Sequence, residues 1–441
     1  MAGSVLPAGQ GPQAGGSAPA ETPRAGWLKG LKNPTSWLQW GMDLRIRWEY
    51  APNTFQLDEH LDEERHYQRY RSRLSVKAEP ARDVELNARL AWEFRMWQQP
   101  KDRREFDGDE AMFDILNFRL RNFASLPLTI TAGRQEIKHG DGWLVYEGTP
   151  GDGTRTYFFD AIRLLYDIRT IKTAVDFAFI CNHSDSARYI RPFNDRQESL
   201  AEENSKGFIL YVTNKSLPQT QFDGYLIYKH DSPVENKGND AEIYTFGGRF
   251  DRTWAKHWQG HVEGAAQLGQ RNSADHIAFG LNSGLSYHFN DKLKNVLYCG
   301  YEFLSGDDPG TSTDTEFDPA WGRWSRFSSL YQYTQRIETR HANYTNMHRV
   351  GQGWQCRPWA KAELNCNYNL MFAPENTYAA KAGFSESGHV RGHLLAAKLN
   401  QTFSDCLAMC WLAELFLPGD YYDDGRNEPA AFLRWEITMK W

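Results

Sequence analysis

Polar and apolar residues alternate one by one in long stretches of this chain, and no other feature restricts its fold as strongly. Between residues 42 and 50 the apolar side chains occupy the even positions and the charged side chains the odd ones. Segments 86–96 and 433–441 repeat the pattern. A β-strand sends alternate residues to opposite faces, whereas a helix cannot sort such a sequence onto two faces. These segments are therefore predicted to be β-strands.

Less regular stretches of the same kind fill the rest of the chain, which predicts 18 strands between Trp40 and Trp441. The predicted strands are 42–50, 68–78, 86–96, 114–124, 128–137, 158–168, 171–181, 206–214, 220–230, 241–251, 256–269, 276–289, 294–304, 344–355, 360–372, 391–403, 405–416 and 433–441. The connections between them alternate in length, with long ones such as 98–111 and short ones such as 125–127. Around 251–256 and 270–275 both connections are short, so the alternation is weakest there.

This sorting of connections by length is typical of a bacterial outer-membrane barrel, with long extracellular loops and short periplasmic turns. Mean hydropathy is only −0.66, and no stretch approaches the ~20 apolar residues of a membrane helix. Yet 14% of the residues are aromatic, as the girdles of a barrel require. We expect an all-β fold, a transmembrane antiparallel up-and-down β-barrel of about 18 strands in the outer membrane. A soluble β-sandwich is the alternative, but it has no reason to sort its loops by length.

The expected domain division is a low-complexity, periplasmic N-terminal segment at 1–39 followed by the barrel at 40–441. The N-terminal segment has neither a basic region nor the apolar run of a secretory signal, so the chain is either intracellular or lacks its signal peptide. Net charge is −6, from 50 basic and 56 acidic residues. This balance argues against nucleic-acid binding, for which a basic surface is expected.

The polar faces of the first six strands are nevertheless predominantly basic. Ten cations stand against five acids there: Arg45, Arg47, Arg69, Arg71, Arg73, Lys77, Arg89, Arg95, Arg119 and Arg121 against Asp43, Glu49, Glu79, Glu85 and Glu93. Rings of Arg or Lys are the usual device of anion pores. The predicted basic solute path comprises Arg45, Arg47, Arg71, Arg73, Arg89, Arg95, Arg119, Arg121, Arg134 and Arg163, with Asp43, Glu49 and Glu93 as counter-charges. The acidic excess is expected mainly in the loops.

Other features carry weaker expectations. The Gly-rich loop 138–157 is expected to fold into the barrel and constrict it. The acidic run 307–318 lacks the spacing of a calcium loop, and His257 and His261 have no third ligand in view, so no metal or other cofactor is expected. The motifs of serine hydrolases, zinc proteases and P-loop proteins do not occur, so we do not expect an enzyme.

Three segments resemble those of the alginate-export family of outer-membrane proteins. They are the GRQEIKHGDGWLV segment 133–145, the YEFLSGDDP and TEFDP segments at 301–309 and 315–319, and LFLPGD at 415–420. The resemblance implies an 18-stranded barrel that carries alginate, an anionic polysaccharide. Two departures concern the solute: Trp143 stands where a basic residue is common, and Lys398 where an acidic one is common.

We therefore expect a passive outer-membrane channel that exports or admits an alginate-like anionic polysaccharide through an Arg-lined lumen. Its partners would be outer-membrane lipid and the polysaccharide or small anionic solutes, with periplasmic secretion proteins as further candidates. Three alternatives remain: a general anion-preferring porin, a plugged barrel that acts as a surface scaffold, and an enzyme such as a membrane-embedded hydrolase or a soluble polysaccharide lyase.

Overall fold

The computed structural model describes residues 34–101, 110–146, 158–185, 187–195, 203–234, 238–322, 325–334, 338, 344–379 and 381–441. These residues form 18 strands in a single antiparallel sheet. The strands are β1 (Leu38–Ala51), β2 (Arg65–Ala81), β3 (Val84–Gln99), β4 (Ala111–Leu120), β5 (Leu128–Gln135), β6 (Phe159–Ile168), β7 (Thr173–Asn182), β8 (Glu203–Asn214), β9 (Thr220–Pro233), β10 (Ala241–Trp254), β11 (Trp258–Arg271), β12 (Ala274–His288), β13 (Val296–Leu304), β14 (Met347–Cys356), β15 (Ala362–Phe372), β16 (Val390–Ser404), β17 (Leu407–Pro418) and β18 (Ala430–Lys440). Three short helical segments are also described: α2 (Tyr331–Thr334), η1 (Phe123–Ser125) and η2 (Arg169–Ile171). All 18 predicted strands are confirmed.

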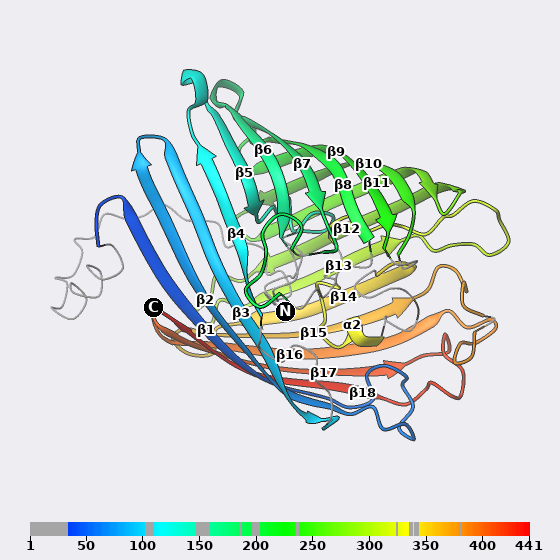
Figure 1. The fold of residues 1–441 in the computed structure, drawn as a ribbon. Coiled ribbons are helices and arrows are strands. Elements are labelled where there is room, and N and C mark those ends of the chain that lie inside the picture. The colour runs from blue at the N-terminus through cyan, green and yellow to red at the C-terminus, as the bar shows by residue number, and fades with distance from the viewer. Residues whose placement is uncertain are drawn as a thin grey trace.

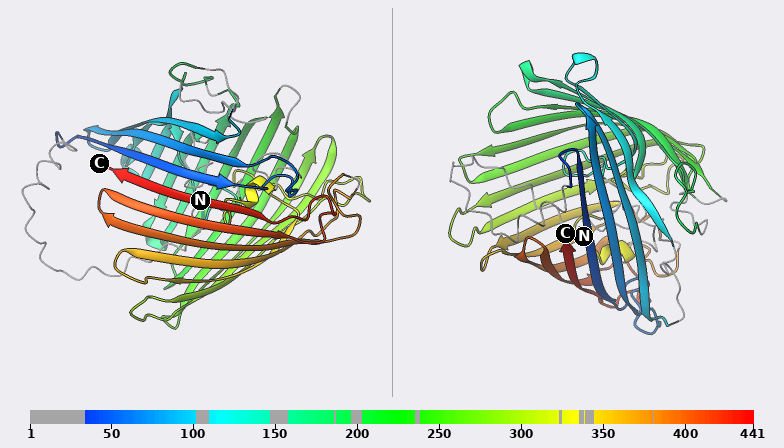
Figure 2. Two further views of the ribbon diagram at one scale, coloured as in Figure 1. Left: turned by 90° about the horizontal axis from the view of Figure 1, so that it is seen from below. Right: turned by 60° about the vertical axis from the view of Figure 1, so that its left-hand side comes forward.

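The sheet closes on itself, because β1 pairs with both β2 and β18. Figures 1 and 2 show the resulting barrel, in which consecutive strands are neighbours all the way round. At the closure, the backbone N–H of Met42 donates to the carbonyl of Trp441 at 2.9 Å. Closure leaves no unpaired sheet edge, which a bilayer would not tolerate.

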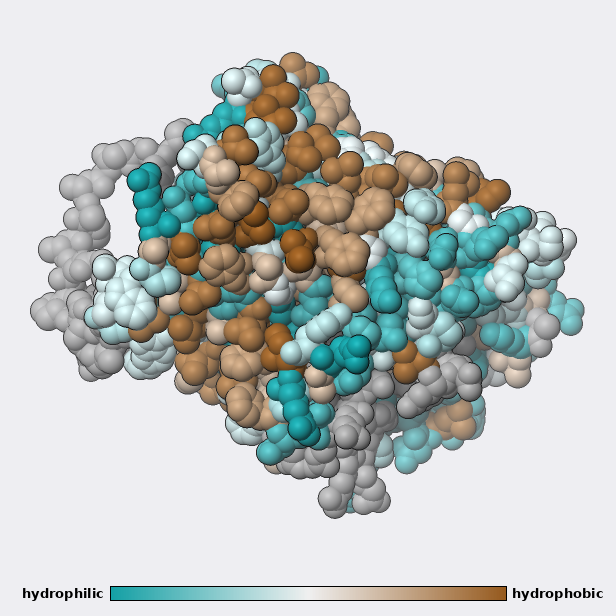
Figure 3. Space-filling view, turned by 45° about the horizontal axis from the view of Figure 1, so that its top comes forward, coloured by the Kyte–Doolittle hydropathy of each residue, from teal (hydrophilic) through white to brown (hydrophobic). Residues whose placement is uncertain are grey.

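Cross-strand pairing assigns the two faces of each strand. On β1, Arg45, Arg47 and Glu49 face the lumen and are buried, while Met42, on the opposite face, is 45% exposed. The same alternation gives an outward band of large apolar side chains that includes Phe118, Ile162, Phe179, Phe279, Val350 and Leu395. On the face drawn in Figure 3, apolar side chains of this kind lie between more hydrophilic regions. A continuous apolar band on the outer face of a barrel is typical of contact with lipid.

Tryptophans mark the short-turn end of the barrel. Trp40 and Trp441 pack edge-to-face with their ring centroids 4.8 Å apart, and Trp254 pairs with Trp258 across the turn 255–257. Trp side chains prefer the polar–apolar boundary of a membrane. This end of the barrel therefore lies at a membrane interface, and its short turns are typical of the periplasmic side.

The connections are sorted by length as predicted, with one exception. Residues 82–83, 121–127, 169–172, 215–219, 255–257, 289–295, 357–361 and 405–406 form short turns at one end. At the other end the connections include 52–64, 136–158, 305–346 and 373–389. Between β11 and β12 the connection is only Asn272 and Ser273, both in the left-handed region with φ 49° and 70°. This tight hairpin explains the weak point predicted at 270–275.

Two further observations bear on the sequence expectations. No described helix is long and apolar enough to cross a bilayer. Most of the predicted N-terminal segment, residues 1–33, lies outside the described residues, and β1 begins at Leu38.

Candidate functional site

Four adjacent strands concentrate most of the predicted solute-path residues on one side of the lumen. We call the lumenal face of β18, β1, β2 and β3 the basic wall. The pairing register shows which charged residues share this face. They are eleven cations and six acids. The cations are Arg45, Arg47, Arg65, Arg69, Arg71, Arg73, Lys77, Arg89, Arg95, Arg434 and Lys440, and the acids are Asp43, Glu49, Glu79, Glu85, Glu93 and Glu436.

Ion pairs between neighbouring strands hold the basic wall in place. They are Arg434–Glu49 at 2.8 Å, Arg71–Asp43 at 3.0 Å, Arg73–Asp43 at 2.8 Å and Arg45–Glu93 at 4.0 Å, together with Arg47–Glu436 and Arg69–Glu93. In five of these six pairs the acid is Asp43, Glu49 or Glu93. Each carboxylate fixes a guanidinium in position without cancelling the local excess of positive charge.

The register also places arginines directly opposite one another. Arg45 lies opposite Arg71, Arg47 opposite Arg69, and Arg69 opposite Arg95. Like charges at directly opposed positions destabilise a sheet. Arg45 and Arg47 are each only 2% exposed, so their repulsion is less screened than it would be in water. A purely structural wall would alternate the signs, so this arrangement favours a functional role.

Four other predicted cations form ion pairs with lumenal carboxylates. These ion pairs lie outside the opposed arginine pairs. They are Arg89 with Asp114 at 2.8 Å, Arg119 with Glu85 at 3.1 Å, Arg121 also with Glu85, and Arg163 with Asp176 at 2.9 Å. Arg119 and Arg121 lie towards the periplasmic turn between β4 and β5. Arg163 on β6 is separated from the basic wall by β4 and β5.

The predicted lumenal position of Arg134 was wrong. On β5, Thr131 and Gln135 face the lumen, so Arg134 shares the outward face with Ile130. Its guanidinium bonds Asp160 of β6 at 2.9 and 3.0 Å and the carbonyl of Phe113 at 2.9 Å. The prediction followed the motif around Arg134, whereas strand parity decides which way the side chain points.

Arg434 and Glu436 were missed because the sequence analysis counted only the first six strands. Their signal was present in the alternating segment 433–441, but closure of the barrel is what brings them beside β1. The sequence analysis expected the acidic excess mainly in the loops and did not consider lumenal acids on the later strands. Lumenal acids line the far side of the barrel as well, at Asp176, Asp223, Asp231, Asp251, Glu263, Glu302 and Glu414.

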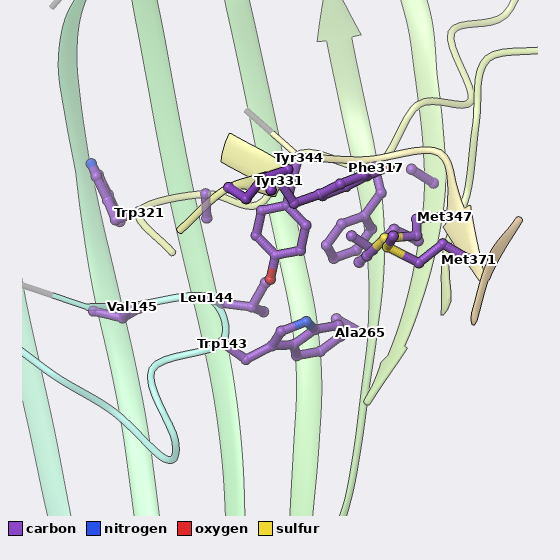
Figure 4. Close-up of a cluster of buried hydrophobic side chains, with 14 of the residues drawn as sticks. Trp143, Leu144, Val145, Ala265, Phe317, Trp321, Tyr331, Tyr344, Met347 and Met371 are labelled. Carbon is purple, nitrogen blue, oxygen red and sulfur yellow. The ribbon is translucent and has the colours of Figure 1, made fainter. Parts of the chain in front are cut away.

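One inward loop, residues 136–146, packs against that far side, as the sequence analysis expected of the Gly-rich segment; residues 147–157 of that segment lie outside the described residues. Trp143 is 1% exposed, and its indole N–H donates to Glu302 of β13 at 3.0 Å. Asp141 accepts a hydrogen bond from Arg249 of β10 at 3.0 Å. Figure 4 shows Trp143 and Leu144 among the apolar side chains of a second loop. Trp143 therefore anchors this loop to the barrel wall.

That second loop, within residues 305–346, reaches across the lumen. Near its start, Asp318 lies 3.2 Å from Arg271 and 3.6 Å from Lys229. Further along, the backbone N–H groups of Ser329 and Leu330 donate to Glu414 of β17. Tyr333 then meets Tyr67 of β2, with 2.9 Å between the hydroxyl oxygens. The loop thus links the acidic side of the barrel to the basic wall.

A pH dependence follows from Glu316 in this loop. Burial raises the pKa of Glu316 to about 7, against the opposing effect of Arg271, while Asp314, Asp307 and Asp318 add to the rise. The folded loop therefore binds more protons than the free loop between pH 4.5 and 7, and its stability falls as pH rises through that window.

Asp314 and Asp318 act in the opposite direction. His276 and Arg271 hold the pKa of Asp314 below its usual range, and Lys229, Arg271 and His276 do the same for Asp318. The stability that these two carboxylates contribute is lost only as pH falls below their ordinary pKa. The pH range in which Glu316 titrates is therefore separate from theirs. We expect amide hydrogen exchange in 305–322 to accelerate between pH 5 and 7.5, after correction for the intrinsic exchange rate. Glu316→Gln should flatten this response. An unchanged response in the variant would contradict the assignment.

No grouping of His, Cys, Asp or Glu suited to a metal occurs within the described ranges. In the acidic run, Asp314 lies 3.0 Å from Arg271 and 2.7 Å from His276. His261 faces Asp141 at 3.8 Å. These carboxylates are engaged with cationic or imidazole groups of the barrel wall.

Comparisons with known proteins agree with this structure. It is a closed 18-stranded barrel with inward loops and a charged lumen. The family model described as alginate export matches residues 36–379. The chain belongs to this family. Its location is the bacterial outer membrane, and family membership and fold together identify it as an outer-membrane channel protein. Comparison with curated proteins yields no match.

Solved structures share the fold of this alginate-export family member at low sequence identity. OpdQ of Pseudomonas aeruginosa is similar with a TM-score of 0.59 and 10% identity, over 92% of this chain and 97% of that one. The outer-membrane protein OpdK of the same organism gives 0.58 and 10%, over 91% and 99%. OccK2 (OpdF), solved with glucuronate, gives 0.55 and 9%, over 91% and 97%.

Proposed function

We propose that the protein is a passive channel for anionic solutes and that its polymeric solute is an alginate-like polysaccharide. The directly opposed arginines of the basic wall carry this proposal. Arg45 with Arg71 and Arg47 with Arg69 place four guanidinium groups at adjacent positions, and only part of that charge is neutralised by neighbouring carboxylates. An excess of fixed positive charge raises the local concentration of anions.

The guanidinium group also suits the chemistry of a uronate polymer. Its planar fork can bond a carboxylate at two atoms and stays charged at any physiological pH. The partial neutralisation by Asp43, Glu49 and Glu93 limits how tightly any one carboxylate is held. A polymer with a carboxylate on each sugar would then be attracted along the basic wall by many weak electrostatic interactions. Family membership and the glucuronate bound by OccK2 support this choice of solute.

Channel block by polymers tests the proposal. In planar bilayers, alginate oligomers should interrupt the current of the pure protein at concentrations where a neutral glucan of equal length does not. The open channel should prefer chloride to potassium at neutral pH. Equal block by both polymers, or a preference for cations, would refute the proposal. Absence of any current would favour the scaffold alternative.

A small-solute porin is the second candidate, and the inward loops favour it. Loop 136–146 and the described parts of loop 305–346 occupy part of the lumen and contact both sides of it. In liposome swelling assays, uptake of glucuronate without uptake of alginate oligomers would identify this narrower function. Uptake of both would support the polymer channel.

A further inference from the structure

The outward face of β11–β18 carries an apolar groove of about 1250 Å³. Its side chains form two adjacent rows that run across the strands in the hydrogen-bonding direction. One row is Trp258, Tyr287, Leu297, Trp354, Cys366, Ala397, Ala413 and Leu433, and the other includes Leu285, Cys299, Gln352, Tyr368, Leu395, Leu415 and Ala431. The later strands of this face are turned towards the viewer in the left panel of Figure 2.

The shape of the groove follows from residue size along the first row. Trp258 and Tyr287 stand at its start, beside the periplasmic turns, and their rings lie 4.8 Å apart. Further along, Cys366, Ala397 and Ala413 are directly paired neighbours. Three small side chains in succession leave a depression that large neighbours on both sides deepen. Seven strand spacings of about 4.8 Å give the row a length of roughly 34 Å.

Three periplasmic turns lie side by side at the aromatic end of the groove. They are 255–257, 289–295 and 357–361. The N–H of His288 donates to the carbonyl of His257 at 2.8 Å, and the N–H of Arg357 donates to that of Leu293 at 2.6 Å. Leu293 and Trp359 are 45% and 55% exposed. Exposed apolar side chains on turns of this kind insert into the membrane interface.

These three turns form a cationic cluster. They carry five cations, Lys256, Lys292, Lys294, Arg357 and Lys361, and one acid, Asp291. Asp291 is occupied by hydrogen bonds from the backbone and side chain of Asn295 at 2.9 and 2.5 Å. Arg357 lies 3.8 Å from Glu363, and all five cations are exposed. An apolar groove that ends at exposed cations matches a molecule with an apolar tail and an anionic head.

We propose that this groove binds an anionic phospholipid of the periplasmic leaflet, with its acyl chains along the Cys366–Ala397–Ala413 row and its headgroup phosphate at Lys292 and Lys294. The groove faces the membrane, the three turns lie at the level of the lipid headgroups, and their charge is positive. All three features fit an anionic phospholipid. Each basic residue near the membrane surface strengthens the attraction for anionic lipid. The site is separate from the lumen, and it does not depend on which solute the channel carries.

Native mass spectrometry of the full chain, released from detergent, tests the headgroup contact. Phosphatidylglycerol should remain bound in preference to phosphatidylethanolamine. The double variant Lys292→Gln/Lys294→Gln should lower this preference by about tenfold or more. The matched control is Lys172→Gln/Lys215→Gln, which removes two exposed cations from other periplasmic turns and should retain the preference. Loss in both variants, or in neither, would overturn the proposal.

Filling the groove tests the acyl-chain contact separately. Ala413→Phe should reduce binding of both lipids, whereas Ala88→Phe, on the outward face of β3 away from the groove, should not. Heat-modified gel mobility of each variant verifies that the barrel has folded. Dimers or trimers that exclude lipid, and that Ala413→Phe disrupts, would show instead that a second copy covers the groove.

Discussion

Replacing Arg45 and Arg71 by glutamine is expected to lower the preference of the channel for anions by at least about fivefold. These residues are directly opposed on β1 and β2. A unit charge about 4 Å away contributes about 1 kcal/mol even at the dielectric constant of water, which corresponds to about fivefold in local anion concentration. Reversal potentials in a salt gradient measure the change directly.

The same variant separates function from stability. Arg45 and Arg71 repel each other, but they also contact Glu93 at 4.0 Å and Asp43 at 3.0 Å. Loss of repulsion and loss of attraction oppose one another, so the unfolding temperature should change little. The control Arg82→Gln/Lys215→Gln removes two exposed cations from periplasmic turns and should leave selectivity almost unchanged. An unaltered reversal potential in the Arg45/Arg71 variant would exclude the basic wall from the solute path.

Substituting Glu414 by alanine is expected to release the inward loop around Ser329. One carboxylate accepts hydrogen bonds from the backbone N–H of Leu330 at 2.6 Å, from that of Ser329 at 2.9 Å and from the Ser328 hydroxyl at 3.1 Å. A hydrogen bond to a charged group contributes about 1.5–3 kcal/mol. Loss of even about 2 kcal/mol raises the population of the detached loop about 30-fold.

Two measurements follow from a detached loop. Single-channel conductance should rise, because the loop no longer crosses the lumen, and protease cleavage within 325–334 should accelerate. Glu363→Ala is the matched control, since Glu363 is a lumenal carboxylate on β15, two strands from β17, and lies against Arg357 of a periplasmic turn. Faster cleavage without any rise in conductance would show that the loop does not limit the flow of ions.

Alternation along the chain was enough to predict the strands and the barrel. A strand places successive side chains on opposite faces whatever the rest of the molecule does, so 42–50 and 433–441 could be assigned to strands from local pattern alone. Loop lengths then ordered the two ends of the barrel. The lumenal direction of Arg45, Arg47 and Glu49 followed from the same parity.

Only the tertiary structure decided which charges meet. Barrel closure pairs Arg47 with Glu436, although 389 positions separate them. The strand register places Arg134 on the outward face. Contacts with distant strands hold Trp143 and the described parts of the 305–346 loop in the lumen. The outward groove, too, exists only because Cys366, Ala397 and Ala413 come into line on three strands. Sequence determines the faces of a strand because that property is local; neighbours across a closed sheet depend on register and closure, which are properties of the whole chain.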